Sequence, residues 1–312
     1  MKFIAVSLLA LLLTGCSMST KQVVNDVKDG VVLITNELPN NGGGIGTGFI
    51  VGENQIVTNL HVVDGEGIVH VYDNGSQRKY KAVILHKDPV ADLVVLQLFD
   101  WDSFVQNEHP EILSLGNSDN AEVGEKIIVI GHPWGLYWTV SEGIVSAKGR
   151  RIDQNPKFLD QVDAKLYQGN SGGPIFDEAG NVVCVSNMML AKEGGSYGFC
   201  IPSNLVKKVL YDFSVFGEVR WRVMNVSASM TEDGANVIIK ELDPDGAASK
   251  AGLQINDKIL MLNDIEVRNP DDLISGMAVL KGDTENVKLL IDRNGEKLMI
   301  DVKTNHKLSK EY

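Results

Sequence analysis

The residue types most suggestive of chemistry in this sequence surround Ser171, in the run QGNSGGP at residues 168–174. Glycines on both sides of a serine let the backbone turn tightly and let a substrate approach closely. Such a turn exposes the hydroxyl and can aim several backbone N–H groups at one point, as an oxyanion hole requires. The run therefore predicts a serine nucleophile, although alone it fits a plain surface loop equally well.

Two further residues supply the partners that a serine nucleophile needs. His61 follows the apolar run IVTNL, and Asp92 precedes the apolar run LVVL. Taken singly, a histidine there is more often structural, and an aspartate there is more often a turn or cap residue. The order His, Asp, Ser along the chain, however, matches that of chymotrypsin-like proteases. We therefore expect His61 to be the general base and Asp92 the acid that orients it.

The elements that must position these residues are predominantly strands. Short β-branched runs broken by Gly, Asn and Asp recur from residue 31 onward, among them VVLIT, DLVVLQL and KIIVIG. Many short strands with frequent turns predict a sandwich or a barrel, and the 31 glycines fit this β-rich pattern. Residues 21–29 and 202–213 have helical character, and the second of these helices is expected to close the first domain.

The length of 312 residues exceeds what one hydrophobic core usually organises, so we expect two domains. The composition changes near residue 217, where a strand, a short helix, a strand pair, a longer helix and a strand hairpin follow one another. We assign residues 31–216 to the first domain and residues 217–306 to a compact second domain. Residues 16–30 are expected to hold a tether and the first helix.

The N-terminus has the features of an export signal. Met1 and Lys2 precede an apolar run that ends at Leu13, too short to span a membrane comfortably, and the sequence LTGC ends at Cys16. This sequence resembles the bacterial lipoprotein signal, which implies removal of residues 1–15, acylation of Cys16 and a membrane anchor. Ser17 would favour the outer membrane under the sorting rule of enteric bacteria. The alternatives are an uncleaved signal anchor and a chance cysteine.

The remaining cysteines, Cys184 and Cys200, lie on two segments that could pair as neighbouring strands. Export from the cytoplasm would permit a disulfide between them. Since the sequence does not fix the distance between their Cα atoms, we expect buried free thiols.

Composition and motifs argue against several other functions. The net charge of −12, without a long basic run, disfavours binding to nucleic acids. The glycine-rich residues 42–48 lack the Gly-Lys-Ser/Thr ending of a phosphate-binding loop. The histidines other than His61 show no metal-ligand spacing, so we expect neither a metal nor another cofactor.

The longer runs GTGFIV, VTNLHVV, ADLVVL, IIVIGHPWG and QGNSGGPIFDEAGNVV resemble the HtrA (Deg) family of envelope proteases. The similarity covers nearly the whole chain after Ser19, and GANVIIKEL and PDGAASKAGL in the second domain resemble a PDZ domain. The resemblance implies a mainly β fold, with a chymotrypsin-like double six-stranded β-barrel protease domain followed by a small α+β PDZ domain. It also implies that the backbone N–H groups of Gly169, Asn170 and Ser171 form the oxyanion hole.

The resemblance further indicates where substrates bind. Residues before the nucleophile and a second loop line the primary pocket, so Leu166 and Met189 predict cleavage after small or medium apolar side chains. An inward-pointing Lys165 would instead favour acidic groups.

In the PDZ domain, the residues closest to the family's hydrophobic-glycine-hydrophobic carboxylate loop are Trp221, Arg222 and Val223, with Arg222 in place of the glycine. Residues 225–233 are also shorter than the family's usual helix at that place. Binding of a peptide carboxylate here and a structural or regulatory docking role are therefore both open.

The main hypothesis is a serine endopeptidase that cuts unfolded or specific regulatory proteins in the bacterial envelope, in protein quality control and stress response. The family resemblance implies a homotrimer. The rival hypothesis is a chaperone-like or scaffold protein of the same fold that cuts nothing. The intact set of His61, Asp92 and Ser171 favours the first.

Overall fold

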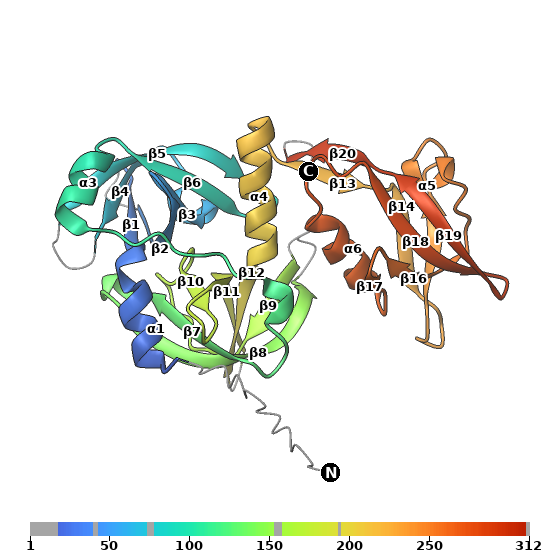
Figure 1. Ribbon diagram of the computed structural model, residues 1–312, viewed down its shortest axis with the longest axis horizontal. Helices are drawn as coiled ribbons and strands as arrows, with labels where there is room; N and C mark the ends of the chain where they lie inside the picture. Colours follow the sequence, from blue (N-terminus) through green and yellow to red (C-terminus); the bar gives the residue numbers. More distant parts are fainter. Residues whose placement is uncertain (1–17, 40–42, 74–77, 153–157, 193–194, 310–312) are drawn as a thin grey trace, which may run out of the picture.

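The computed structural model describes residues 18–39, 43–73, 78–152, 158–192 and 195–309 (Figure 1). The predicted signal sequence and the predicted acylation site, Cys16, lie outside these residues. Within the described ranges, no helix is both long and apolar enough to cross a membrane.

The first half of the protease region is a closed, antiparallel six-stranded barrel. Its strands, in the order in which they pair around the barrel, are β1 (Val31–Glu37), β2 (Gly43–Gly52), β3 (Gln55–Asn59), β6 (Leu93–Leu98), β5 (Lys79–Asp88) and β4 (Ile68–Tyr72). Its core is made of fully buried aliphatic side chains, among them Ile34, Ile50 and Leu96. The short helix α2 (Leu60–Val63) follows β3, and α3 (Trp101–Glu108) packs Phe104 onto the same core.

The second half is another closed six-stranded barrel, so the predicted double-barrel fold is confirmed. Its strands pair in the order β7 (Lys126–Gly131), β8 (Thr139–Arg151), β9 (Phe158–Val162), β12 (Gly195–Pro202), β11 (Val182–Lys192) and β10 (Pro174–Phe176). The two barrels share a large apolar core that includes Phe49, Ile128 and Phe176.

Two helices are packed on this shared core. The first, α1 (Thr20–Val27), buries Val23 and Val27 and begins with a capping box formed by Ser19 and Gln22. The second, α4 (Ser203–Phe216), runs beside both barrels (Figure 1) and buries Val206 and Val209. Both helices agree with the sequence prediction.

The prediction of free thiols is wrong, because Cys184 and Cys200 form a disulfide. Antiparallel pairing of β11 with β12 places Ser186 opposite Cys200 and brings the two cysteine Cα atoms to 5.7 Å, within bonding range. The bond is buried in the core of the second barrel.

Replacing both cysteines by alanine is expected to lower the free energy of unfolding by about 3 kcal/mol. The disulfide closes a loop with a sequence separation of 16 residues, which restricts the unfolded chain. Guanidinium unfolding of the Cys184→Ala/Cys200→Ala variant against the wild type measures the change. Equal unfolding midpoints with equal slopes would contradict it.

The C-terminal domain has the architecture predicted for a PDZ domain. A five-strand path with one short side strand forms its main sheet: β14 (Val226–Met230), β15 (Val237–Leu242), β16 (Lys258–Leu262), β18 (Asn286–Arg293) and β19 (Glu296–Lys303), with β17 (Ile265–Glu266) paired to β16. Helices α5 (Ala247–Lys250) and α6 (Pro270–Ala278) cover its core. A separate pair, β13 (Arg220–Val223) and β20 (Asn305–Leu308), connects the domain to α4.

A buried polar cluster ties this domain to the protease domain. Lys208 on α4 pairs with Asp212 at 2.9 Å, and its Nζ lies 4.1 Å from the centre of the Trp221 ring. The indole N–H of Trp221 donates to Ser309 Oγ at 2.9 Å and to Asp88 Oδ2 at 3.3 Å. Burial raises the pKa of Asp88. Because Asp88 also accepts the N–H of Ala91 at 2.6 Å, the cluster braces the turn that ends at Asp92.

Candidate active site

The predicted acid and base lie side by side at one end of the first barrel. His61 is on α2, and its Nδ1 lies 2.7 Å from Asp92 Oδ2. The backbone N–H of His61 donates to the other carboxylate oxygen, Oδ1, at 3.0 Å. Pairing of Asn59 with Leu93 between β3 and β6 explains the proximity, because Asp92 directly precedes β6 and His61 lies two residues after the end of β3. The carboxylate therefore holds the imidazole by two contacts.

The backbone of Asp92 is itself fixed in an uncommon conformation. Its φ is +56°, in the left-handed region that few non-glycine residues adopt. Its carbonyl oxygen accepts the N–H of Leu60 at 3.1 Å and the side-chain amide of Asn59 at 3.0 Å. These bonds hold the acid against the helix that carries His61.

Ser171 lies in a tight loop whose shape depends on two glycines. Gly169 and Gly172 have φ values of +104° and +82°. A Cβ on Gly169 would lie 2.6 Å from the carbonyl oxygen of His132, and one on Gly172 would overlap the Thr58 hydroxyl. Glycine is therefore required at both positions.

The backbone of this loop leaves two N–H groups unused. The Asn170 N–H donates to the Tyr167 carbonyl at 2.9 Å. Within the described part of the chain, the N–H groups of Gly169 and Ser171 have no acceptor. Of the three predicted oxyanion donors, Gly169 and Ser171 thus remain available, whereas Asn170 is engaged inside the loop.

The loop is braced by the turn that follows β7. Thr47 Oγ1 donates to the Gly169 carbonyl at 2.7 Å and accepts the His132 N–H at 3.0 Å. The Trp134 N–H donates to the Gln168 carbonyl at 2.9 Å. Burial lowers the pKa of His132 to about 4, so this imidazole is neutral at neutral pH.

The Ser171 hydroxyl donates to the backbone carbonyl of Asn187 at 3.2 Å. The side-chain amide of the same Asn187 donates to Asp92 Oδ2 at 2.8 Å. Among the described residues, no hydrogen bond joins Ser171 to the His61 imidazole, whose side chain is 48% exposed. The hydroxyl must leave Asn187 to reach the base. Sequence analysis did not find Asn187, because one asparagine within a strand carries no motif.

The predicted pocket residues lie together on the second barrel. Leu166 is buried, and its side chain lies against Gly198 and Val162. Met189 on β11 is paired with Gly198 on β12 and is partly exposed. Lys165 is exposed, so the inward-pointing lysine is not observed. The walls at this position are apolar.

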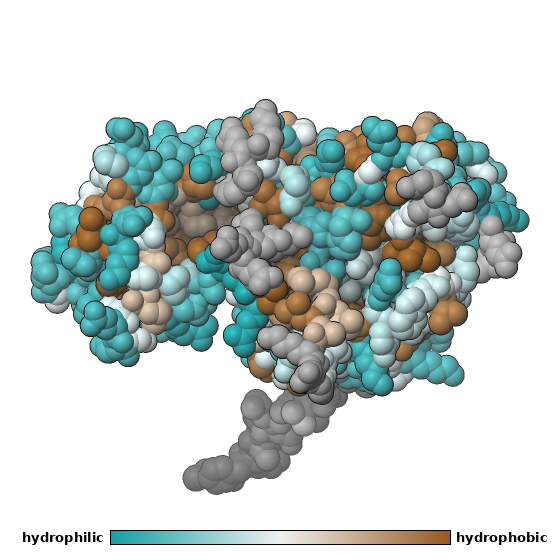
Figure 2. All heavy atoms as spheres, turned by 180° about the vertical axis from the view of Figure 1, so that it is seen from behind, coloured by the Kyte–Doolittle hydropathy of each residue, from teal (hydrophilic) through white to brown (hydrophobic). Residues whose placement is uncertain are grey.

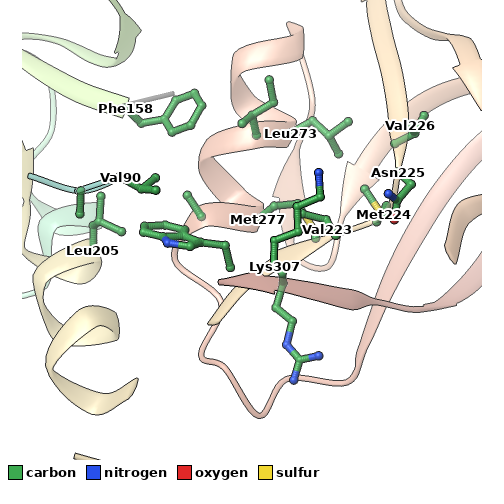
Figure 3. Close-up of a pocket in the computed structure, with 15 residues that line it drawn as sticks. Val90, Phe158, Leu205, Val223, Met224, Asn225, Val226, Leu273, Met277 and Lys307 are labelled. Carbon is green, nitrogen blue, oxygen red and sulfur yellow. The ribbon is translucent and has the colours of Figure 1, made fainter. Parts of the chain in front are cut away.

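The three predicted PDZ residues line a pocket of about 300 Å³ between the two domains (Figure 3). Strand β13, the start of β14 and helix α6 form one side, and Val90, Phe158 and Leu205 of the protease domain form the other. Figure 2 shows the molecule from behind, where hydrophobic residues lie in the recess between the domains. The pocket is therefore shared by both domains, which the sequence did not reveal.

Two of the three predicted carboxylate-loop residues have partners within the protein. Trp221 is buried against Asp88 and Lys208, and the Arg222 guanidinium donates to the Gly282 carbonyl. In the described residues, the N–H groups of Met224 and Asn225 have no acceptor. These two residues, which sequence reasoning missed, form the turn between β13 and β14 and border the pocket.

Among the described residues, no group of three or more His, Cys, Asp or Glu side chains is placed to hold a metal ion. The chemistry available at the site is that of a serine, a histidine and a carboxylate.

The double barrel and this side-chain set define the class of trypsin-like serine proteases, here joined to a PDZ domain. Residues 46–185 match the trypsin-like peptidase domain, and residues 223–304 match the PDZ domain. The chain belongs to the HtrA (Deg) family, as the sequence resemblance indicated.

Individual relatives agree with this assignment. A probable periplasmic serine endoprotease DegP-like protein of Chlamydia trachomatis is 35% identical over 272 residues, which is 82% of this chain and 53% of that protein. Its counterpart in a Marinomonas species is 33% identical over 83% of this chain and 56% of its own length. The chain thus spans about half the length of the curated relatives it matches.

Solved structures show the same architecture over nearly the whole chain. The HtrA-type protease AlgW, solved with a tripeptide, superposes with a TM-score of 0.72 at 26% identity. The match covers 93% of this chain and 97% of AlgW.

Proposed function

We propose that this protein is a serine endopeptidase of the bacterial cell envelope that hydrolyses peptide bonds in unfolded or specific regulatory proteins. The observation that carries the proposal is the His61–Asp92 pair, with Nδ1 2.7 Å from the carboxylate, next to a serine loop in which two N–H groups have no acceptor among the described residues. The Chlamydia and Marinomonas relatives are named probable periplasmic serine endoproteases, which supports the same reaction and compartment.

The reaction begins when Ser171 Oγ attacks the carbonyl carbon of the scissile bond while His61 Nε2 takes the hydroxyl proton. The C=O electron pair moves to oxygen, and the N–H groups of Gly169 and Ser171 stabilise that oxyanion. Asp92 stabilises the imidazolium through the Nδ1 contact. Collapse of the intermediate breaks the C–N bond, and His61 gives its proton to the leaving amine.

The second half of the reaction removes the acyl group from Ser171. His61 takes a proton from water as the water oxygen attacks the ester carbon. The tetrahedral species collapses, the ester C–O bond breaks, and His61 returns the proton to Ser171 Oγ. The enzyme is thereby regenerated without a cofactor.

Leu166 and Met189 would form the pocket for the residue that precedes the cleaved bond. Leu166 is buried beside Gly198, so this wall of the proposed pocket is apolar. Small or medium aliphatic side chains fit such a pocket best. This agrees with the preference that the resemblance implies.

The pocket between the domains would take an extended peptide or a docking segment. Strand β14 is an edge strand, and PDZ domains bind peptides by adding a strand to such an edge. The N–H groups of Met224 and Asn225 are the donors available for a peptide carboxylate. AlgW was solved with a tripeptide, which supports peptide binding by this chain without assigning it to this pocket. A purely regulatory docking role is the alternative.

Lipid attachment at Cys16 would hold the protein on a membrane, facing the periplasm, after removal of residues 1–15.

We also propose a homotrimer with a role in protein quality control under stress. The proposed units are the tether and first helix at residues 16–30, the protease domain at 31–216 and the PDZ domain at 217–306.

Hydrolysis of unfolded casein by the purified protein tests the proposed activity. We expect discrete peptides, with new C-termini enriched in small and medium aliphatic residues when mapped by mass spectrometry. Binding of casein that delays its aggregation, without any cleavage, would instead support the chaperone-like alternative.

A further inference from the structure

An exposed aromatic pair lies beside the nucleophile loop. Trp134, in the turn after β7, and Tyr167, just before Gln168, stack with their ring centres 5.0 Å apart and their planes inclined by 34°. Trp134 is 60% exposed and Tyr167 is 37% exposed. Tryptophan is highly buried on average, and exposed aromatic rings are typical of surfaces that bind other molecules. The aromatic pair is therefore available to a molecule bound at the active site.

The backbone of Trp134 holds this ring outward in an uncommon conformation. Its φ is +51°, in the left-handed region where a bulky residue is an outlier. Its N–H donates to the Gln168 carbonyl at 2.9 Å, which fastens the turn to the nucleophile loop. Such conformations persist only where the surroundings fix them, and they cluster at functional sites. The conformation is thus a second observation that favours a role in binding.

Ile45 on β2 lies against the same turn. A Cβ on Gly135 would lie 3.2 Å from Ile45 Cδ1. Ile45 and Thr47 are two residues apart on the strand, so their side chains point to the same side. Thr47 Oγ1 contacts the Gly169 carbonyl and the His132 N–H on that side. Ile45 therefore belongs to the same surface as the aromatic pair.

This surface borders the side of the nucleophile on which His61 lies. A Cβ on Gly46 would lie 2.6 Å from both γ-methyl carbons of Val62, the residue after His61, and 2.9 Å from the Ser171 carbonyl oxygen. In the proposed reaction His61 protonates the leaving amine, so the residue that follows the cleaved bond lies on the His61 side of Ser171. The residue before the bond lies against the second barrel instead.

We propose that Ile45, Trp134 and Tyr167 form a binding site for an aromatic side chain on the residue directly after the cleaved bond. We call it the leaving-side site. The proposal rests on the proposed function, because it names a substrate feature for the same reaction. A flat ring in the substrate stacks on the aromatic pair and packs against the isoleucine, which removes apolar surface from water on both partners.

A purely structural role for Trp134 makes a different prediction. Its ring could serve only to hold the turn on the nucleophile loop, through the stack with Tyr167. Loss of the ring would then disturb the loop and slow the cleavage of every substrate by the same factor. Binding of a substrate side chain instead predicts a loss that depends on which residue follows the cleaved bond.

Two fluorogenic peptides separate these roles. Both are derived from one mapped casein cleavage site and differ only in the residue directly after the cleaved bond, which is phenylalanine in one and alanine in the other. We expect the wild type to have a kcat/KM about 10-fold higher for the phenylalanine peptide, as the stacking and burial of one aromatic ring allow.

Substitutions in the aromatic pair test where that preference comes from. We expect Trp134→Ala to reduce it to about 2-fold and Trp134→Phe, which keeps a ring, to retain most of it. Tyr167→Ala is expected to weaken it as well, and this variant decides if Trp134→Ala does not fold. Thermal unfolding of each variant is measured in parallel.

Phe99→Ala is the matched control. Phe99 is also an exposed aromatic residue, but it directly follows β6, whose other end adjoins Asp92, so the length of the strand separates it from the site. This variant is expected to keep the preference and the rates of the wild type.

Equal kcat/KM values of the wild type for the two peptides would overturn the inference, as would a Trp134→Ala protein that loses the same factor on both. Ser171→Ala is run in the same assay. If it retained hydrolysis, the proposed function itself would fail. If it is inactive while the wild type cleaves both peptides equally well, only the leaving-side site is refuted.

Discussion

Ser171→Ala is expected to lower kcat for casein hydrolysis by on the order of 10⁶, the loss seen on removing a serine nucleophile. The substitution removes the oxygen that we propose attacks the peptide carbonyl. It also removes the hydroxyl that donates to the Asn187 carbonyl at 3.2 Å, which is long for an O–H donor and therefore a weak bond. Folding should therefore be nearly unaffected. The measurement is the rate of casein cleavage with the circular dichroism of both proteins.

Ser214→Ala is the matched control for that variant. Ser214 is on α4, and its hydroxyl donates to the Tyr211 carbonyl of its own helix, at 2.7 Å. It is expected to cleave casein at the wild-type rate. A folded Ser171→Ala protein that cleaves at more than a few per cent of that rate would show that another group is the nucleophile.

Asp92→Asn is expected to lower kcat by about 10⁴ with a small effect on KM. An asparagine there can present an NH₂ group to His61 Nδ1, which favours the tautomer with its proton on Nε2. That tautomer cannot take the serine proton. The loss of the negative charge 2.7 Å from the imidazole also destabilises the imidazolium that forms during attack. Steady-state kinetics on the casein-derived peptide measures both constants.

Asp100→Asn provides the control for this exchange of side chains. Asp100 caps α3 by accepting the Ser103 N–H at 3.1 Å, and asparagine caps helices equally well. The control should therefore match the wild type in activity and stability. A loss of less than tenfold in Asp92→Asn would mean that this carboxylate does not orient the base.

Local sequence was sufficient for the elements that carry the three central residues. The apolar runs around His61 and Asp92 form β3 with α2 and β6, and glycines around Ser171 form the tight loop. These patterns were informative because each depends on near neighbours in the chain: strand alternation, turn residues and positive φ angles. The family resemblance then supplied the barrel topology, which depends on distant pairings.

What the sequence did not reveal depends on distances in space. The disulfide needed the register of β11 against β12, which places Cys184 and Cys200 at a Cα separation of 5.7 Å. The contact of Asn187 with the acid could not be predicted either, because its amide, on the second barrel, lies 2.8 Å from Asp92 on the first. No local pattern encodes either relation.

The sequence also did not predict which residues of the PDZ domain are available for binding, because this too depends on contacts between distant residues. Arg222 stands where the family pattern has a glycine, and its guanidinium donates to the backbone carbonyl of Gly282 in its own domain. Met224 and Asn225 carry N–H groups that have no acceptor among the residues that the structure describes. The pocket also includes protease residues such as Phe158, and only packing of the two domains could show this.

The most direct test of the central claim is to locate a fluorophosphonate adduct by peptide mapping after the native protein has been treated during casein cleavage. We predict one adduct per chain, on Ser171, formed in step with the loss of cleavage and absent from the His61→Ala variant. An adduct on a different serine, or casein cleavage that continues after every Ser171 is modified, would contradict the account.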